Sequence, residues 1–130
     1  MVIDTSALIA ILEQEPQAGA LALAIQEDCT RLLCAASLLE ASIVMAARRG
    51  EVACRELDLL VYRAGIEVSP VTREQAEIGR QAFLSYGKGR HPASLNYGDC
   101  FVYALSATSG EPILATGDDF GRTDAAVVTV

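Results

Sequence analysis

Apolar residues along the chain form short runs that alternate with longer segments of helical character. The short runs lie at residues 2–3, 32–34, 66–68, 112–116 and 126–130, and their length and composition predict β-strands. The longer segments start near residues 5, 17, 37, 51, 72 and 97, and their apolar spacing or content predicts helices. Strands and helices therefore take turns along the chain.

Residues with capping side chains stand at several of the expected helix starts. Thr5 or Ser6 can cap the first helix, and Asn96 can cap the last. Thr72 precedes Gln75 by three positions, which is the spacing of a capping box. These signals support the helices assigned from the apolar spacing.

The alternation predicts an α/β sandwich with a mostly parallel central sheet. With 130 residues, 52% of them apolar, the chain suits a single domain over residues 1–130. Ligands of such sheets gather where the strands end. Asp4 directly follows the first strand, so we expect it at the mouth of a site.

Composition and charge exclude several classes of protein. The four cysteines form no CxxC pair, and a single histidine, His91, cannot complete a zinc cluster. No apolar run approaches the roughly 20 residues that cross a bilayer, so we expect a cytoplasmic protein without membrane contact. The net charge of −7 argues against overall attraction to nucleic acid, yet eight of the ten lysines and arginines lie between Arg48 and Arg90.

Four acidic positions stand beside or within apolar segments. Asp4 follows the first strand, Glu40 and Asp99 lie in two predicted helices, and the pair at 118–119 follows the strand at 112–116. Carboxylates in apolar surroundings need a partner, because removing them from water costs several kcal/mol. The chain offers few cations for this purpose, so the acids predict an all-oxygen site for Mg²⁺ or Mn²⁺.

Each acid also has an interpretation that needs no metal. Ser37 with Glu40 matches the spacing of a capping box, and so does Asn96 with Asp99. The acids at 118–119 fit an ordinary turn. Asp4 is the hardest to explain in this way, because the two residues after it already offer capping hydroxyls.

Four segments together resemble a known family. They are "VIDTSALIAIL" at the start, "AASLLEAS", "LNYGDCFVYALSATSG" and "ILATGDDFGRTD" near the end. Their order and spacing resemble those of PIN-domain ribonucleases of the VapC toxin type. The resemblance implies a three-layer α/β/α sandwich and a Mg²⁺-dependent endoribonuclease. It also implies the toxin half of a type II toxin–antitoxin pair, homodimeric and inhibited by a small VapB-like antitoxin.

The resemblance also assigns roles to individual residues. Asp4 and Asp99 would be the main metal ligands, and Glu40 with Asp118 would complete the catalytic acidic cluster. Ser6 would orient Asp4 or a metal-bound water. The doubled acid leaves the choice between Asp118 and its neighbour Asp119 open, and we favour Asp118.

The glycine-containing segment 85–99 predicts a loop that carries Lys88 and Arg90 shortly before Asp99. These cations are candidates for contact with the RNA backbone, although a solvated loop without a ligand would look the same.

Two alternatives to a nuclease remain at this point. An aspartate-nucleophile phosphatase would also place an aspartate after its first strand, but it expects a second aspartate where this chain has Ser6. A non-catalytic PIN-like interaction module is the other, although all four acidic positions are filled.

Overall fold

Four short strands form one parallel sheet in the computed structural model, which describes residues 1–130. In chain order the strands are β1 (Val2–Ile3), β2 (Leu32–Cys34), β3 (Glu67–Ser69) and β4 (Ile113–Leu114). They lie side by side in the order β3-β2-β1-β4. The carboxyl ends of all four strands therefore meet at one edge of the sheet.

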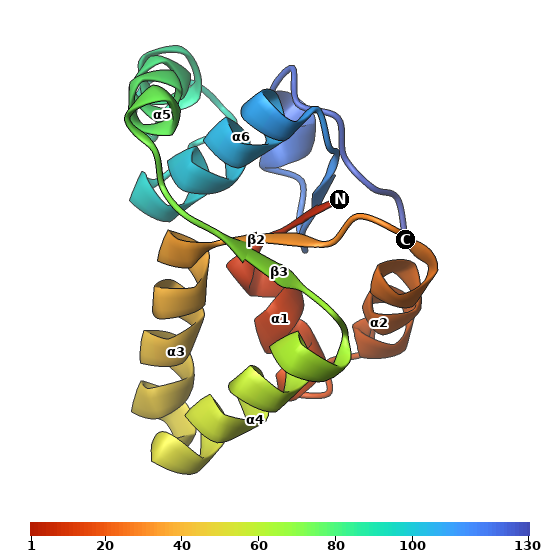
Figure 1. Ribbon diagram of the computed structural model, residues 1–130. Helices are drawn as coiled ribbons and strands as arrows, with labels where there is room; N and C mark the ends of the chain where they lie inside the picture. The colour runs from red at the N-terminus through yellow and green to blue at the C-terminus, as the bar shows by residue number, and fades with distance from the viewer.

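Helices cover both faces of this sheet (Figure 1). On one face lie α1 (Thr5–Leu12), α2 (Ala18–Glu27), α3 (Ala35–Arg49) and α4 (Glu51–Arg63), and on the other α5 (Arg73–Tyr86) and α6 (Tyr97–Ser109). A short 3₁₀ helix, Phe120–Arg122, follows β4. This arrangement confirms the predicted α/β/α sandwich with a parallel sheet.

Alternate residues of the strands build two separate cores. Ile3 and Leu33 face the helices of the first layer, where they pack with buried side chains of α1 to α4. Val2, Cys34 and Ile113 face the opposite way and pack with α5, α6 and the segment after β4. Strands buried on both faces are apolar at every position rather than at alternate ones, which is why these runs are continuous in the sequence.

Two predicted helix starts are wrong. The cap of α1 is Asp4, whose side chain accepts a hydrogen bond from the backbone N–H of Ser6, rather than Thr5 or Ser6. Helix α3 begins at Ala35 because β2 runs into it without a loop, and Cys34 is its cap without a side-chain bond. Ser37 therefore lies inside the helix, and the capping-box interpretation of Glu40 fails.

The other two capping predictions are confirmed. Thr72 and Gln75 form a complete capping box at α5, and Asn96 and Asp99 form one at α6. The predicted terminal strand at 126–130 is shorter than expected. It pairs with β4 only through a single bridge between Ile113 and Val127.

None of the helices combines the length and the apolar character needed to span a membrane.

Candidate active site

Asp4 lies at the carboxyl end of β1, at the centre of the sheet edge. Its backbone N–H donates to the carbonyl of Leu114 at 2.9 Å, so the pairing of β1 with β4 fixes its position. The residue is only 7% exposed, and its Oδ2 accepts from the backbone N–H of Ser6 at 2.9 Å and from the Ser6 hydroxyl at 2.5 Å. The carboxylate is thus buried with hydrogen-bond donors from a single residue and no cation.

The Ser6 hydroxyl links the carboxyl ends of the neighbouring strands β1 and β4. It donates to Asp4 Oδ2 and accepts from the backbone N–H of Thr116, just beyond β4, at 3.0 Å. An acceptor on one side and a donor on the other leave the hydroxyl little rotational freedom. The geometry therefore suits Ser6 to hold the Asp4 carboxylate in one orientation.

Helix α3 is tied to the same region by a neighbouring hydroxyl. Thr5 Oγ1 donates to the carbonyl of Ser37 at 3.2 Å, and Glu40 follows less than one turn later on α3. The Glu40 carboxylate lies directly against Gly98 of α6, where a Cβ atom would collide with Oε2. A side chain at residue 98 would therefore displace the Glu40 carboxylate from its present position.

Sequence reasoning missed Gly98 as part of the site. The available signal was a glycine inside a predicted helix directly before an acid, a position where a close approach is a common cause. The identity of the approaching group could not be inferred, because Glu40 is far from Gly98 along the chain.

The ionisation of Asp99 depends on burial and on the other acids. Its Oδ2 accepts from the backbone N–H of Asn96 at 2.9 Å. The pKa of Asp99 is raised to about 6, with burial as the largest cause, although the bond from Asn96 acts in the opposite direction. Further increases come from the negative charges of three other acids, which are Asp4, Asp119 and Glu40. Carboxylates from three other segments of the chain therefore act on Asp99.

The pKa of Asp4 is shifted in the same direction as that of Asp99. Burial raises the pKa of its carboxyl, and the negative charge of Glu40 adds to this, while the hydrogen bonds from Ser6 act against it. Lysine and arginine form ion pairs elsewhere in the molecule, but none with Asp4, Glu40 or Asp99. The cluster formed by Asp4, Glu40, Asp99 and Asp119 is called the acidic cluster below.

The doubled acid after β4 divides into two different environments. Asp118 is paired with Arg122, whose Nη2 and Nε lie 2.8 and 3.1 Å from Oδ2, and its side chain is 72% exposed. Asp119 is the member of the pair whose charge raises the pKa of Asp99. The two acids, both exposed, thus differ in their neighbours, and the choice of Asp118 as the fourth acid, which the sequence led us to favour, stays a prediction.

The donor set of the acidic cluster suits a hard divalent cation. Every side-chain donor is a carboxylate oxygen, and a positive ion would offset the burial and the like charge that raise the pKa of Asp4 and of Asp99. No three histidine, cysteine, aspartate or glutamate side chains already form the geometry of a metal site. Binding would therefore require the carboxylates to turn toward a common centre.

The candidate RNA-binding cations lie on the loop between α5 and α6. Lys88 is exposed, and its backbone N–H donates to the carbonyl of Leu95. The guanidinium of Arg90 lies over the ring of Phe83, 5.7 Å from the centroid. Neither side chain forms an ion pair with the acidic cluster.

Comparison with known proteins identifies the family. The PIN domain family matches residues 1–126. The chain belongs to the PIN-domain family, within the VapC ribonucleases. It is 50% identical over 130 residues to Ribonuclease VapC30 of Mycobacterium tuberculosis, covering 100% of this chain and 99% of that protein. It is 52% identical over 128 residues to Ribonuclease VapC of Mycolicibacterium smegmatis, covering 98% of this chain and 99% of that protein.

Solved structures of VapC proteins share the fold of this PIN-domain chain. The crystal structure of Mycobacterium tuberculosis VapC20, a Sarcin-Ricin loop cleaving toxin, has a TM-score of 0.80 at 17% identity and covers 99% of this chain and 98% of its own. The crystal structure of VapBC2 from Rickettsia felis, bound to a DNA fragment from the promoter, has a TM-score of 0.77 at 11% identity. The match covers 98% of this chain and 96% of that chain. At these identities the likeness concerns the fold alone.

Proposed function

We propose that this VapC-family chain is a divalent-metal-dependent endoribonuclease and the toxin of a type II toxin–antitoxin pair. Its curated relatives, which it matches over 99% of their length, are named ribonucleases. The observation that carries the proposal is the acidic cluster at the carboxyl edge of the sheet, where burial and like charge raise the pKa of both Asp4 and Asp99. The phosphatase alternative has no such support and is abandoned.

The residues of the acidic cluster would hold Mg²⁺ or Mn²⁺. Asp4 and Asp99 would be the main ligands, with Glu40 and Asp119 at the periphery. A bound cation supplies an activated water and neutralises charge on the scissile phosphate. Ser6 would keep the Asp4 carboxylate oriented through its hydroxyl, and Asp99 would be held by its bond from the N-cap of α6.

The RNA backbone needs cations outside the acidic cluster, because four carboxylates repel phosphate. Lys88 and Arg90 are our candidates, since both lie on the exposed loop that leads into α6. Arg90 is kept near α5 by its position over the ring of Phe83.

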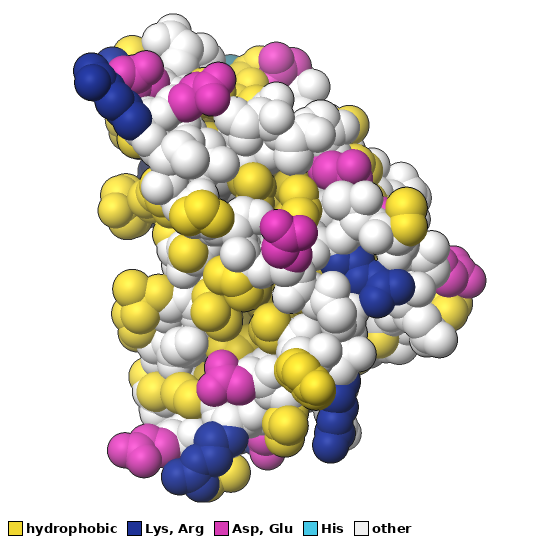
Figure 2. All heavy atoms as spheres, in the orientation of Figure 1, with side chains coloured by type: hydrophobic (Ala, Val, Ile, Leu, Met, Phe, Trp, Pro, Cys, Tyr) yellow, Lys and Arg dark blue, Asp and Glu magenta, His cyan; other side chains and the backbone are white.

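The proposed partners are a small VapB-like antitoxin and a second copy of this chain. Leu39 and Ile43 are one turn apart on α3 and both are exposed, and Leu59 and Tyr62 are exposed on α4. Figure 2 shows hydrophobic side chains gathered along α3 on the surface of the molecule. Such surfaces support association with another protein.

The proposal is tested by cleavage of mixed and structured RNAs with purified protein. Cleavage is expected in Mg²⁺, is expected to stop in excess EDTA, and is expected to return when Mg²⁺ is restored, because the phosphate then meets a neutralised site. Equal cleavage in excess EDTA would contradict a metal-dependent mechanism.

The two acids after β4 provide a second, more local prediction. Asp119→Asn is expected to lower the cleavage rate at least about tenfold, because its charge acts on the acidic cluster. Asp118→Asn is the matched control, since it removes only the exposed pair with Arg122 and is expected to retain most activity. Initial cleavage rates in saturating Mg²⁺ measure both variants. The reverse order of activities would identify Asp118 as the fourth acid.

A further inference from the structure

Tyr97 is a strongly exposed aromatic residue beside the acidic cluster. It is the first residue of α6, and its side chain is 82% exposed. Gly98, which packs against the Glu40 carboxylate, follows it directly, and Asp99 comes next. An exposed ring therefore adjoins two of the four acids.

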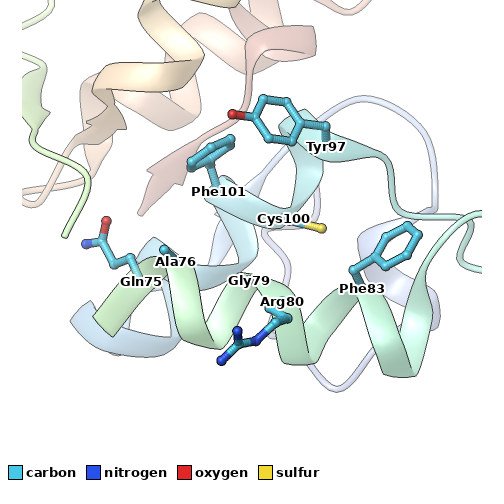
Figure 3. Close-up of a pocket in the computed structure, with 8 residues that line it drawn as sticks. All are labelled: Gln75, Ala76, Gly79, Arg80, Phe83, Tyr97, Cys100 and Phe101. Carbon is cyan, nitrogen blue, oxygen red and sulfur yellow. The ribbon is translucent and has the colours of Figure 1, made fainter. Parts of the chain in front are cut away.

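The Tyr97 ring has a defined orientation. Its neighbour one turn along α6 is Phe101, with the ring centroids 4.8 Å apart and the planes at 89°. This edge-to-face contact is a preferred aromatic geometry. Figure 3 shows both rings projecting from α6. A ring held in this way loses little conformational freedom when a ligand packs against it.

Two apolar hollows meet at this aromatic pair. One, of about 520 Å³, lies between α5 and α6 and is lined by Tyr97, Phe101 and Phe83 (Figure 3). The other, of about 300 Å³, lies between α3 and α6 and is lined by Tyr97, Phe101, Leu39 and Glu40. The second hollow thus connects the exposed ring to a carboxylate of the acidic cluster.

Tyr86, the other aromatic residue beside the loop, is engaged inside the protein. Its ring contacts the His91 ring edge-on at 5.1 Å and lies 6.0 Å from the Tyr103 ring. It also packs against the core on the α5–α6 side of the sheet. Tyr97 is therefore the tyrosine near the acidic cluster that offers a free surface.

We propose that Tyr97 is a substrate-positioning residue whose ring stacks on an unpaired base beside the scissile phosphate. This inference rests on the proposed nuclease function. Aromatic side chains bind every base through its π-face, whereas bases within an A-form duplex are covered by their neighbours. The edge-to-face contact with Phe101 would hold the ring ready for the base.

The test combines binding and fluorescence with a matched control. The probe is a set of short single-stranded RNAs, each with 2-aminopurine at a different position, because the fluorescence of this base falls when it stacks. Every protein tested also carries Asp99→Asn, so that the RNA is not cleaved during the measurement. Tyr97→Leu is expected to weaken binding about tenfold or more and to abolish the fluorescence loss, while Tyr97→Phe preserves both. Tyr62→Leu is the control, because Tyr62 is 84% exposed but lies on α4.

Binding of Tyr97→Leu equal to that of the parent protein would overturn the proposal, as would an equal loss in Tyr62→Leu. A loss in Tyr97→Phe as large as in Tyr97→Leu would also overturn it, because the hydroxyl would then be responsible. Equilibrium sedimentation accompanies each variant, and dissociation of Tyr97→Leu alone would assign the ring to a protein interface instead.

Two further comparisons separate this inference from the nuclease proposal. The same RNA annealed to its complement is expected to bind more weakly and without the fluorescence loss, and tighter binding of the duplex would contradict a preference for unpaired bases. Failure of the wild-type protein to cleave RNA in Mg²⁺ would refute the nuclease proposal, whereas the fluorescence experiment does not depend on cleavage.

Discussion

Asp4→Asn and Asp99→Asn are each expected to reduce RNA cleavage at least about a hundredfold in saturating Mg²⁺, because each removes a proposed principal metal ligand. Asparagine retains an oxygen that can accept the bonds made by the native side chain, from Ser6 at position 4 and from Asn96 at position 99. The local fold is therefore expected to survive. Single-turnover cleavage, with circular dichroism to verify folding, measures the effect.

Glu77→Gln is a suitable control for these two substitutions. Glu77 is an exposed acid on α5 that pairs with Arg73 at 3.1 Å, and it has no part in the acidic cluster. Its loss is expected to leave cleavage nearly unchanged, because exposed pairs contribute little to stability. Activity in Asp4→Asn and Asp99→Asn equal to that of this control would refute the assigned site.

Asp99→Asn is also expected to stabilise the metal-free protein at neutral pH. The pKa of Asp99 is about 6 in the folded protein, whereas an aspartate without these interactions, as in the unfolded chain, has a pKa of 3.8. Between these two pH values the folded state therefore binds more protons than the unfolded state. The free energy of unfolding of the wild type therefore decreases as pH rises from about 4 to 6, and the penalty is complete above that range. We expect a gain of about 1 to 2 kcal/mol at pH 7 for the variant, allowing for solvent screening.

Denaturant unfolding in EDTA at several pH values measures this difference. The stability gap between Asp99→Asn and the wild type is expected to be largest at pH 7 and to close toward pH 4. Mg²⁺ is expected to stabilise the wild type more than the variant, because only the folded wild type offers the complete acidic cluster. A variant no more stable than the wild type at pH 7 in EDTA would contradict this electrostatic description.

The parts of the fold that depend on local patterns could be predicted from the sequence. Apolar runs bounded by polar segments located the strands, and the position of Asp4 after the first of them placed it at the edge of the sheet. The capping box of Asn96 and Asp99 was likewise visible from its spacing. These features follow from interactions between residues that are close along the chain.

The parts that depend on distant contacts could not be predicted in this way. Ser37 and Glu40 have the spacing of a capping box, but α3 starts two residues before Ser37 because β2 leads straight into it. Asp118 and Asp119 are adjacent and chemically identical, so only the position of Arg122 and of the acidic cluster separates them. Both cases depend on neighbours that only the fold brings together.

The hydroxyls of Thr5 and Ser6 have a consequence for the motions of the site. They are consecutive in the sequence but bond in different directions, Thr5 to the carbonyl of Ser37 and Ser6 to the N–H of Thr116. The backbone of Asp4 is itself fixed by its bond to Leu114 of β4 and by its place as the N-cap of α1. Displacing the backbone of Asp4 would require separating β1 from β4, so this residue shifts as a whole only when the sheet opens, on the slow timescale of cooperative unfolding, while its carboxylate can still turn.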